Sequence, residues 1–399
     1  MNNKNISKLK KIIPISFIVV FATFLAIPNT GLYRGEKNAR LIAQTENRRI
    51  TPRPTQSLKS KEFYEQFEKW YQDRLRYRDK AIKRWSDFNL NIGVLNHPKI
   101  FRGKNNWLFH KDMIITSFNE PEQKINSIKH LQSYCNEKGK NFILFIPPSK
   151  ETMYREFFPE QIRNTYKKPD SFFIQSEKLL KNNNINYLSI TQNLKEEKLK
   201  SSHILYIPVD SHWNYYGASF GADKLLQKIS NEHKTKFYEG LNLDGTFLET
   251  VHPGDYLSML GFDPNKNKDT IPWSEKYTNE IFFTDCYTGE TLQVGGLLSK
   301  INYWEKIHNG ELILKNNKST SDIKILVLSD SYTTFMAPYL AQFAKETIIT
   351  HYNGYAEKKT KTDMKYLLKR YDPDVVVLEI VDRVFYPGSN KDLFGKFTY

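Results

Sequence analysis

Apolar residues after position 120 occur mainly in short continuous runs of strand length, rich in Val, Ile and Leu. These runs occupy residues 142–146, 185–190, 325–328, 347–350 and 375–380. In segments before or between these runs, apolar residues recur at helical spacing, for example over residues 125–136 and 362–371. Continuous apolar strands that alternate with helices are typical of a mostly parallel sheet covered on both faces. The pattern therefore predicts an α/β fold whose functional residues collect at the carboxyl ends of strands.

The first hundred residues follow a different pattern, which predicts an anchor, a stalk and a helix. Four lysines precede an apolar run over residues 12–27: Lys4, Lys8, Lys10 and Lys11. Such a run is typical of a signal peptide or short membrane anchor, with the rest of the chain outside the cytoplasm. No clear small-residue cleavage site follows it, which favours an uncleaved anchor within residues 1–33.

Residues 34–100 are interpreted as a polar stalk followed by an amphipathic helix. Aromatic and apolar residues recur at helical spacing over residues 61–88, and we expect this stripe to pack in a core: Phe63, Phe67, Trp70, Tyr71 and Leu75. Residues 101–399 then form one catalytic domain. Within it, residues 103–109 (GKNNWLF) predict a tight turn between two short strands. Residues 236–300 break into short Gly- and Thr-rich pieces, which predicts a β-rich insertion.

Composition narrows the function classes. A 39% hydrophobic and 14% aromatic chain of 399 residues is globular, and its net charge of +15 favours an anionic partner. No zinc-finger spacing or RNA-binding motif is present, so we do not expect nucleic acid. Cys135 and Cys286 are too few for a disulfide framework or a thiolate metal site, and we expect Cys135 to be a buried apolar residue. No metal, nucleotide or other cofactor is implied by any motif.

Ser331 lies at a predicted strand-to-helix turn. Residues 325–339 (ILVLSDSYTTFMAPY) begin as a buried strand, pass through Ser329, Asp330 and Ser331, and continue with helical spacing. A serine at such a corner faces the crevice beyond the sheet, where backbone N–H groups and the helix N-terminus stabilise a developing oxyanion. The alternative is that one of these three residues only caps the helix.

Asp210 and His212 follow another apolar run, two residues apart. In extended backbone, such residues point to the same side. An Asp can then accept a hydrogen bond from one imidazole nitrogen and leave the other free to take a proton from a serine. The alternative is a surface Asp and His in a turn.

Residues 210–213 (DSHW) resemble the D-x-H-W signature of the AlgJ/AlgX proteins of alginate acetylation, and residues 329–332 (SDSY) resemble their serine block. The order of the two blocks is also that of the family, reversed from ordinary SGNH esterases. Further similar segments occur in the same order along the chain: residues 46–48 (ENR), 103–109, 146–159 (IPPSKETMYREFFP), 254–257 (GDYL), 259–261 (MLG) and 373–383 (PDVVVLEIVDR).

The resemblance implies a three-layer SGNH hydrolase-like (flavodoxin-like) fold with circularly permuted motif order. It also implies an O-acetyltransferase acting on an exported polysaccharide: Asp210 orients His212, His212 acts as base and then acid, and Ser331 carries the acetyl group. A carbohydrate deacetylase with the same triad and a non-catalytic polysaccharide-binding or assembly protein are the alternatives. The family's serine block usually begins with Gly, whereas this chain has Ser329, which leaves the geometry of the turn open.

Four further residues are candidates for oxyanion or substrate contacts. Tyr332 follows the proposed nucleophile, and Asn353 follows a predicted strand end, where it is either a second oxyanion donor or a turn residue. Lys150 either approaches a polysaccharide carboxylate or is solvated, and we expect solvation. Trp213 is expected to pack behind His212 rather than to stack on a sugar.

The resemblance also implies partners and a location. We expect an anionic or neutral exopolysaccharide as acceptor and a membrane-bound O-acyltransferase as acetyl donor. The catalytic domain would lie in the periplasm or at the extracellular surface, attached to the membrane by the N-terminal anchor. With no room for a carbohydrate-binding module after the last predicted strand, we expect the layout of AlgJ rather than that of AlgX.

Overall fold

The computed structural model describes residues 15–20, 22–23, 39–40, 43, 50–75, 78–91, 97, 99–111, 122–165, 169–233, 238–241, 248–262, 269–273, 282–285, 291–293, 311–317, 319, 321–352, 362–385 and 397–399. The chain divides into two compact units. One consists of Met1–Pro98 and Pro253–Lys268, and the other of Lys99–His252 and Asp269–Tyr399.

The larger unit is built on an eight-stranded sheet in the order β4-β3-β13-β10-β11-β9-β7-β8. The first five strands in this order pair in parallel. They are β4 (Tyr187–Ser189), β3 (Asn141–Ile146), β13 (Val375–Glu379), β10 (Lys324–Ser329) and β11 (Glu346–His351). All five lie where continuous apolar runs predict strands, so this part of the sequence analysis is confirmed.

The other three strands pair antiparallel, which makes the sheet mixed rather than wholly parallel. They are β9 (Glu311–Lys315), β7 (Phe282–Asp285) and β8 (Thr291–Gln293). The predicted insertion therefore contributes β7 and β8 to the main sheet. It also contributes β5 (Leu248–His252) and β6 (Asp269–Trp273), which pair antiparallel with each other. The sequence analysis missed β9, because its partner β11 lies more than thirty residues further along the chain.

The order of the parallel strands is that of a circularly permuted doubly wound sheet. When counting starts at β10 and proceeds through β11 and β13 to β3 and β4, the order across the sheet becomes 2-1-3-4-5. This is the flavodoxin-like order, in which ligands bind where the first and third strands diverge. In this chain, β10 and β13 are those two strands.

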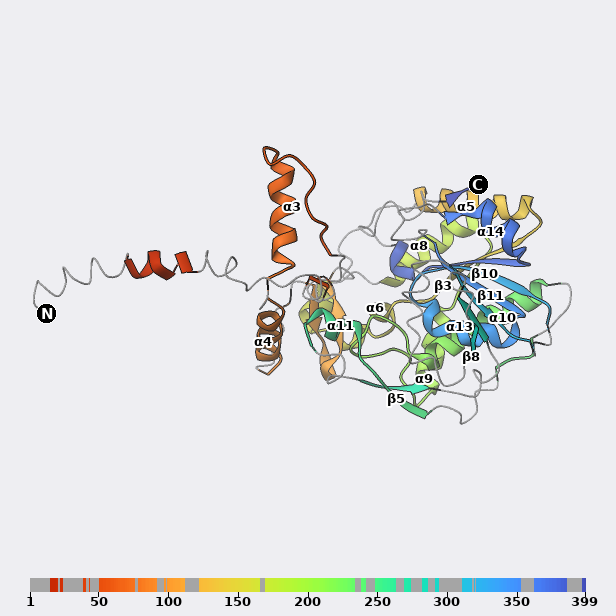
Figure 1. Ribbon diagram of the computed structural model, residues 1–399. Helices are drawn as coiled ribbons and strands as arrows, with labels where there is room; N and C mark the ends of the chain where they lie inside the picture. Colours follow the sequence, from red (N-terminus) through yellow and green to blue (C-terminus); the bar gives the residue numbers. More distant parts are fainter. Residues whose placement is uncertain are drawn as a thin grey trace, which may run out of the picture. The chain divides into compact units, whose positions relative to one another are not determined.

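Helices cover both faces of the parallel strands (Figure 1). Figure 1 shows α5 (Glu122–Glu137), α8 (Pro169–Asn182) and α14 (Met364–Tyr371) on one side of the sheet, and α10 (Tyr215–Glu232) and α13 (Thr333–Phe343) on the other. All side chains of β13 and all but the first of β10 are buried. The predicted three-layer arrangement is therefore present.

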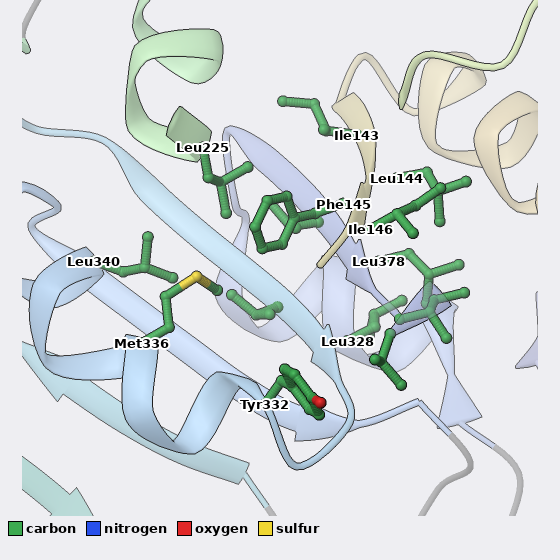
Figure 2. Packing of buried hydrophobic residues seen from close by; sticks show 14 of the residues in the cluster. Ile143, Leu144, Phe145, Ile146, Leu225, Leu328, Tyr332, Met336, Leu340 and Leu378 are labelled. Carbon is green, nitrogen blue, oxygen red and sulfur yellow. The ribbon is translucent and has the colours of Figure 1, made fainter. Parts of the chain in front are cut away.

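Side chains from both faces form one continuous apolar core (Figure 2). Figure 2 shows Phe145 of β3 near Leu225 of α10 on one face of the sheet and Leu328 of β10 near Leu378 of β13 on the other, and all four are fully buried. Burial of each such side chain stabilises the fold by about 1.5–3 kcal/mol. Cys135 is also fully buried, as expected, and burial raises the pKa of its thiol to about 12. Cys286 lies outside the described residues.

The predicted hairpin at residues 103–109 is confirmed. β1 (Ile100–Arg102) pairs antiparallel with β2 (Leu108–His110). Asn105 and Asn106 in the turn have φ angles of 53° and 62°, a left-handed conformation that Asn tolerates better than most residues.

In the smaller unit, the single helix predicted over residues 61–88 is wrong. The structure has α3 (Lys61–Gln72) and α4 (Arg78–Asn91). The turn after α3 is held by the segment before it, because Asp73 accepts a hydrogen bond from the Thr51 N–H and Arg74 donates to the Thr51 carbonyl.

The aromatic stripe of α3 does not pack in a core. Phe63, Phe67 and Tyr71 stack along the helix, but α3 has no buried residue. The described part of this unit also includes a short helix (α11, Asp255–Met259). Among the residues that the structure describes, which include only part of the apolar N-terminal run, no helix is long and apolar enough to cross a membrane.

Candidate active site

Two segments far apart in sequence meet at the carboxyl ends of the parallel strands. The first is the corner between β10 and α13, which carries Ser331. The second is the connection from α9 (Thr191–Lys200) to α10, which carries Asp210 and His212. The proposed nucleophile therefore lies beside the point where β10 and β13 diverge, as expected for a doubly wound sheet.

Asp210, His212 and Ser331 form a continuous hydrogen-bonded chain. His212 Nε2 lies 2.6 Å from Ser331 Oγ, and His212 Nδ1 lies 2.6 Å from Asp210 Oδ1. The backbone N–H of His212 also donates to Asp210 Oδ1, at 3.0 Å. This arrangement fits a neutral imidazole that donates from Nδ1 to the carboxylate and accepts at Nε2 from the serine hydroxyl.

The environment of Asp210 favours its ionised form. Burial alone raises the pKa of this carboxyl, but the His212 imidazole and its hydrogen bonds act in the opposite direction and outweigh burial. The pKa of Asp210 is therefore held well below its usual range. At neutral pH the group is a carboxylate, which can stabilise an imidazolium at His212.

A second histidine, which the sequence analysis missed, contacts the same carboxylate. His252, at the end of β5, places Nδ1 3.7 Å from Asp210 Oδ2 and packs its ring against Phe335 of α13. Its segment contains no motif that could have revealed this contact, because β5 lies outside the main sheet and about forty residues after Asp210.

The structure distinguishes the two serines of the corner. Ser329 is fully buried, and its hydroxyl donates to the Thr350 carbonyl of β11, at 3.3 Å. Ser329 does not adopt positive φ, so this position does not require Gly. Ser331 is only partly buried, and its hydroxyl contacts His212. Of the two, Ser331 has the geometry of a nucleophile.

The corner also provides an oxyanion donor. Within the described part of the chain, no acceptor engages the Ser331 N–H, which lies at the N-terminal end of α13. Tyr332 occupies the N-cap position of that helix without a side-chain cap, and the Asp330 side chain, not that of Ser331, accepts a hydrogen bond from the Tyr332 N–H. The N–H group and the helix N-terminus can therefore stabilise a developing negative charge.

Tyr332 and Trp213 are both fully buried behind His212. The Tyr332 hydroxyl donates to the Ser211 carbonyl, and the Trp213 indole N–H donates to the Tyr332 carbonyl, both at 2.9 Å. Each of the two segments that carry the site therefore donates a side-chain hydrogen bond to a backbone carbonyl of the other. The space behind Trp213 is full, since a Cβ added at Gly221 would lie 2.6 Å from its indole ring. Neither side chain is directed toward a substrate.

The expectation that Lys150 is solvated is wrong. Lys150 begins α6 (Lys150–Met153), is fully buried and donates to the carbonyls of Ile207, Pro208 and Asp210, the first two at 3.3 and 3.1 Å. A buried ammonium is tolerated because backbone oxygens replace its water shell. Lys150 therefore binds the segment that presents Asp210.

Asn353, the candidate second oxyanion donor, lies outside the described residues. Asp210 and His212 are also side chains of the kind that bind metal ions. However, Asp210 Oδ1 and His212 Nδ1 are already hydrogen-bonded to each other. We therefore interpret the cluster as an acid–base group.

Residues 100–282 match the family model of the SGNH hydrolase-like domain of the acetyltransferase AlgX. The matched region includes Asp210 and His212 and ends before Ser331. This match confirms the resemblance to AlgJ/AlgX-type proteins that the sequence motifs indicated. A comparison with curated protein sequences found no match.

Two solved structures are similar in fold. One, Bacillus cereus PatB1 with a sulfonyl adduct, is 19% identical, covers 75% of this chain and 100% of its own, and has a TM-score of 0.52. The other, a DHHW family protein from Eubacterium siraeum, is 12% identical, covers 76% of this chain and 100% of its own, and has a TM-score of 0.53. These likenesses show a shared fold, and the family match describes it as SGNH hydrolase-like.

The buried position of Lys150 leads to a test of its structural role. Lys150→Met keeps most of the side-chain volume but leaves three buried carbonyls without their donor. We expect the free energy of unfolding to fall by about 2–4 kcal/mol, measured by urea denaturation. Lys129→Met, at an exposed position of α5, should change it by less than about 0.5 kcal/mol. Equal effects of the two substitutions would contradict the role assigned to Lys150.

Proposed function

We propose that this protein is an SGNH-type O-acetyltransferase that acetylates hydroxyls of an exported or cell-surface polysaccharide through an acetyl-Ser331 intermediate. The observation that carries the proposal is the pair of 2.6 Å contacts by which His212 joins Asp210 to Ser331. The match of residues 100–282 to the domain of an acetyltransferase supports acetyl as the transferred group.

In the first half-reaction, Ser331 Oγ attacks the carbonyl carbon of the acetyl donor while its proton passes to His212 Nε2. The Ser331 N–H stabilises the negative charge that develops on the carbonyl oxygen, and Asp210 stabilises the imidazolium. The tetrahedral intermediate then breaks its bond to the donor oxygen. His212 Nε2 returns the proton to that oxygen, and an acetyl ester remains on Ser331.

In the second half-reaction, a sugar hydroxyl takes the place of the donor. His212 Nε2 removes its proton, the alkoxide attacks the acetyl-serine carbonyl, and Ser331 leaves with the proton from His212. The neutral His212 regenerated by the first half-reaction is the form needed here.

Hydrolysis is the main competing reaction, because water can replace the sugar hydroxyl. The His212 and Ser331 side chains are partly exposed, so water has access to the intermediate. A deacetylase would use the same triad. The non-catalytic alternative rested on Ser329 replacing a Gly and on an unidentified second donor. Ser329 does not have a positive φ, so its replacement of a Gly no longer argues against catalysis.

The proposed location is outside the cytoplasm, and the proposed acetyl donor is a membrane-bound O-acyltransferase. Support comes from the lysines before the apolar N-terminal run and from the net charge of +15, which suits an anionic polymer or membrane surface.

A sulfonyl fluoride and an activated acetyl ester test the triad. Ser331→Ala should abolish sulfonylation of the peptide that contains residue 331, followed by mass spectrometry. Ser331→Ala, His212→Ala and Asp210→Asn should each lower ester turnover by about 10³–10⁴-fold, because the chain of proton transfer is broken. The sulfonyl adduct reported for PatB1 motivates the choice of probe.

Ser329→Ala is the matched control for the nucleophile. It removes a buried hydroxyl two residues away and should retain turnover within about tenfold, since only one hydrogen bond is lost. Loss of turnover in Ser329→Ala with retention in Ser331→Ala would reverse the assignment.

Acceptor dependence distinguishes transfer from hydrolysis. A bound sugar hydroxyl gains up to about 7–11 kcal/mol of positioning over a freely diffusing nucleophile. The full-length protein with an acetyl donor ester should therefore turn over slowly alone and faster with a suitable oligosaccharide, and acetylated sugar should appear by mass spectrometry. Uronate- and phosphate-containing oligosaccharides are the first acceptors to test. Release of free acetate alone across a broad acceptor panel, with efficient removal of acetyl groups from acetylated polymers, would establish a deacetylase instead.

Topology is tested with a reporter fused after Tyr399. Alkaline phosphatase, which requires an oxidising compartment, should be active in this fusion, and a cytoplasm-dependent fluorescent reporter should not. The reverse pattern would contradict the proposed location.

A further inference from the structure

Two buried carboxyl groups lie directly behind the serine corner, and the proposed mechanism uses neither. Glu379 is the last residue of β13, and Asp330 follows the last residue of β10. Glu379 is fully buried and Asp330 is 8% exposed. They meet where β10 and β13 diverge, so they join the two central strands at the site.

Glu379 binds the corner through one oxygen. Its Oε2 accepts from the Asp330 N–H at 3.0 Å and from the Thr333 hydroxyl at 2.9 Å. Within the described part of the chain, no donor reaches the other oxygen, Oε1, which is also buried. A hydrogen bond between the Glu379 and Asp330 carboxyl groups requires that one of the two carries a proton.

Asp330 is an acceptor through both of its oxygens. Oδ1 accepts from the Tyr332 N–H at 2.8 Å, and Oδ2 accepts from the Val381 N–H at 2.9 Å. Backbone N–H groups favour the ionised form of a carboxyl group. Both Asp330 oxygens thus have a donor, whereas Glu379 Oε1 has none among the described residues, so a proton shared by the two groups is better placed on Glu379.

The charges around the two carboxyl groups come from several elements of the described chain. Among the described residues, no Lys or Arg forms an ion pair with either group. The charged side chains that act on the neighbouring Tyr332 from other elements include Arg383 and Asp382 of η5 (Asp382–Phe385) and Glu151 of α6. Asp382 is bound by the Ser149 N–H and the Thr152 hydroxyl, and Arg383 lies over the Tyr332 ring. Burial, followed by the nearby Asp330 charge, raises the pKa of Glu379 well above its usual range.

We propose that Glu379 is a positioning residue that acts as a neutral carboxylic acid, shares its proton with Asp330, and holds the serine corner against β13. The pair forms hydrogen bonds with residues 330, 332 and 333, which lie on both sides of Ser331 in the sequence. It leaves the Ser331 N–H without a hydrogen bond. The proposal deepens the proposed function, because the position of Ser331 under His212 depends on this corner.

The proposal fixes the sign of a pH effect on stability. In the unfolded chain, Glu379 ionises at a pKa of about 4.3. Because the folded protein keeps the proton above that value, unfolding releases it, and stability falls as the pH rises. Asp210 has the opposite sign: its lowered pKa contributes stability that is present at neutral pH and lost as the pH falls.

Three substitutions in the full-length protein test the proposal. Glu379→Gln replaces the acid by an amide that can donate to Asp330 and still accept from the corner, so Ser331 sulfonylation should stay within about threefold of wild type. Glu379→Ala removes both functions and should slow sulfonylation by about tenfold or more. Asp330→Asn should be more harmful than Glu379→Gln, because one Asn oxygen cannot accept from both N–H groups.

Two readouts do not require enzymatic activity. The melting temperature of wild type should fall as the pH rises above about 5, where Glu379 of the unfolded chain is ionised, and Glu379→Gln should weaken that fall. Infrared difference spectra of wild type minus Glu379→Gln should contain the carbonyl band of a protonated carboxylic acid. Absence of this band together with equal pH profiles, or equal damage from Gln and Ala at position 379, would overturn the proposal. If Ser331 is sulfonylated but no acetyl transfer is found, the proposed function fails and the proposal on Glu379 stands.

Discussion

The parallel pairing of β10 with β13 is the contact on which the rest of the site depends. Leu328 lies opposite Leu378 in this register, so both strands end at nearly the same level and deliver Ser331 and Glu379 to one point. Side chains alternate between the two faces of a strand, and a slip of one residue would turn Glu379 toward the opposite face. The register therefore determines both how the apolar core packs and where the serine lies.

Much of this arrangement follows from local sequence patterns. Fully buried parallel strands need continuous apolar residues, so the apolar runs along the sequence were enough to identify β3, β10, β11 and β13. The spacing of Asp210 and His212 and the strand-to-helix corner at Ser331 also carry their chemistry locally. Glu379 could have been singled out from the sequence, because it is an acidic residue at the end of an otherwise apolar run. Acidic residues are rarely buried without a specific partner, so such a position indicates a buried polar contact.

The features that could not be predicted depend on partners distant in sequence. Lys150 is buried only because the carbonyls of residues 207–210 replace its hydration, and no pattern near Lys150 shows this. His252 reaches Asp210 only through the placement of β5. The break between α3 and α4 depends on Thr51, more than twenty residues before it. Buried polar side chains of this kind fix loops with little freedom to move, which keeps catalytic groups in place before substrate binds.

The permuted strand order also affects how the chain folds as it is synthesised. β3 is almost wholly apolar and has β13 as one neighbour, yet more than two hundred residues separate them. Until the last part of the chain emerges, β3 presents an unpaired apolar edge, which is prone to associate with other chains. Closing the sheet also requires contacts of long sequence separation, which form slowly. Asp210 and His212 are thus synthesised well before Ser331, and the new chain depends on protection from aggregation until β10 and β13 complete the centre of the sheet.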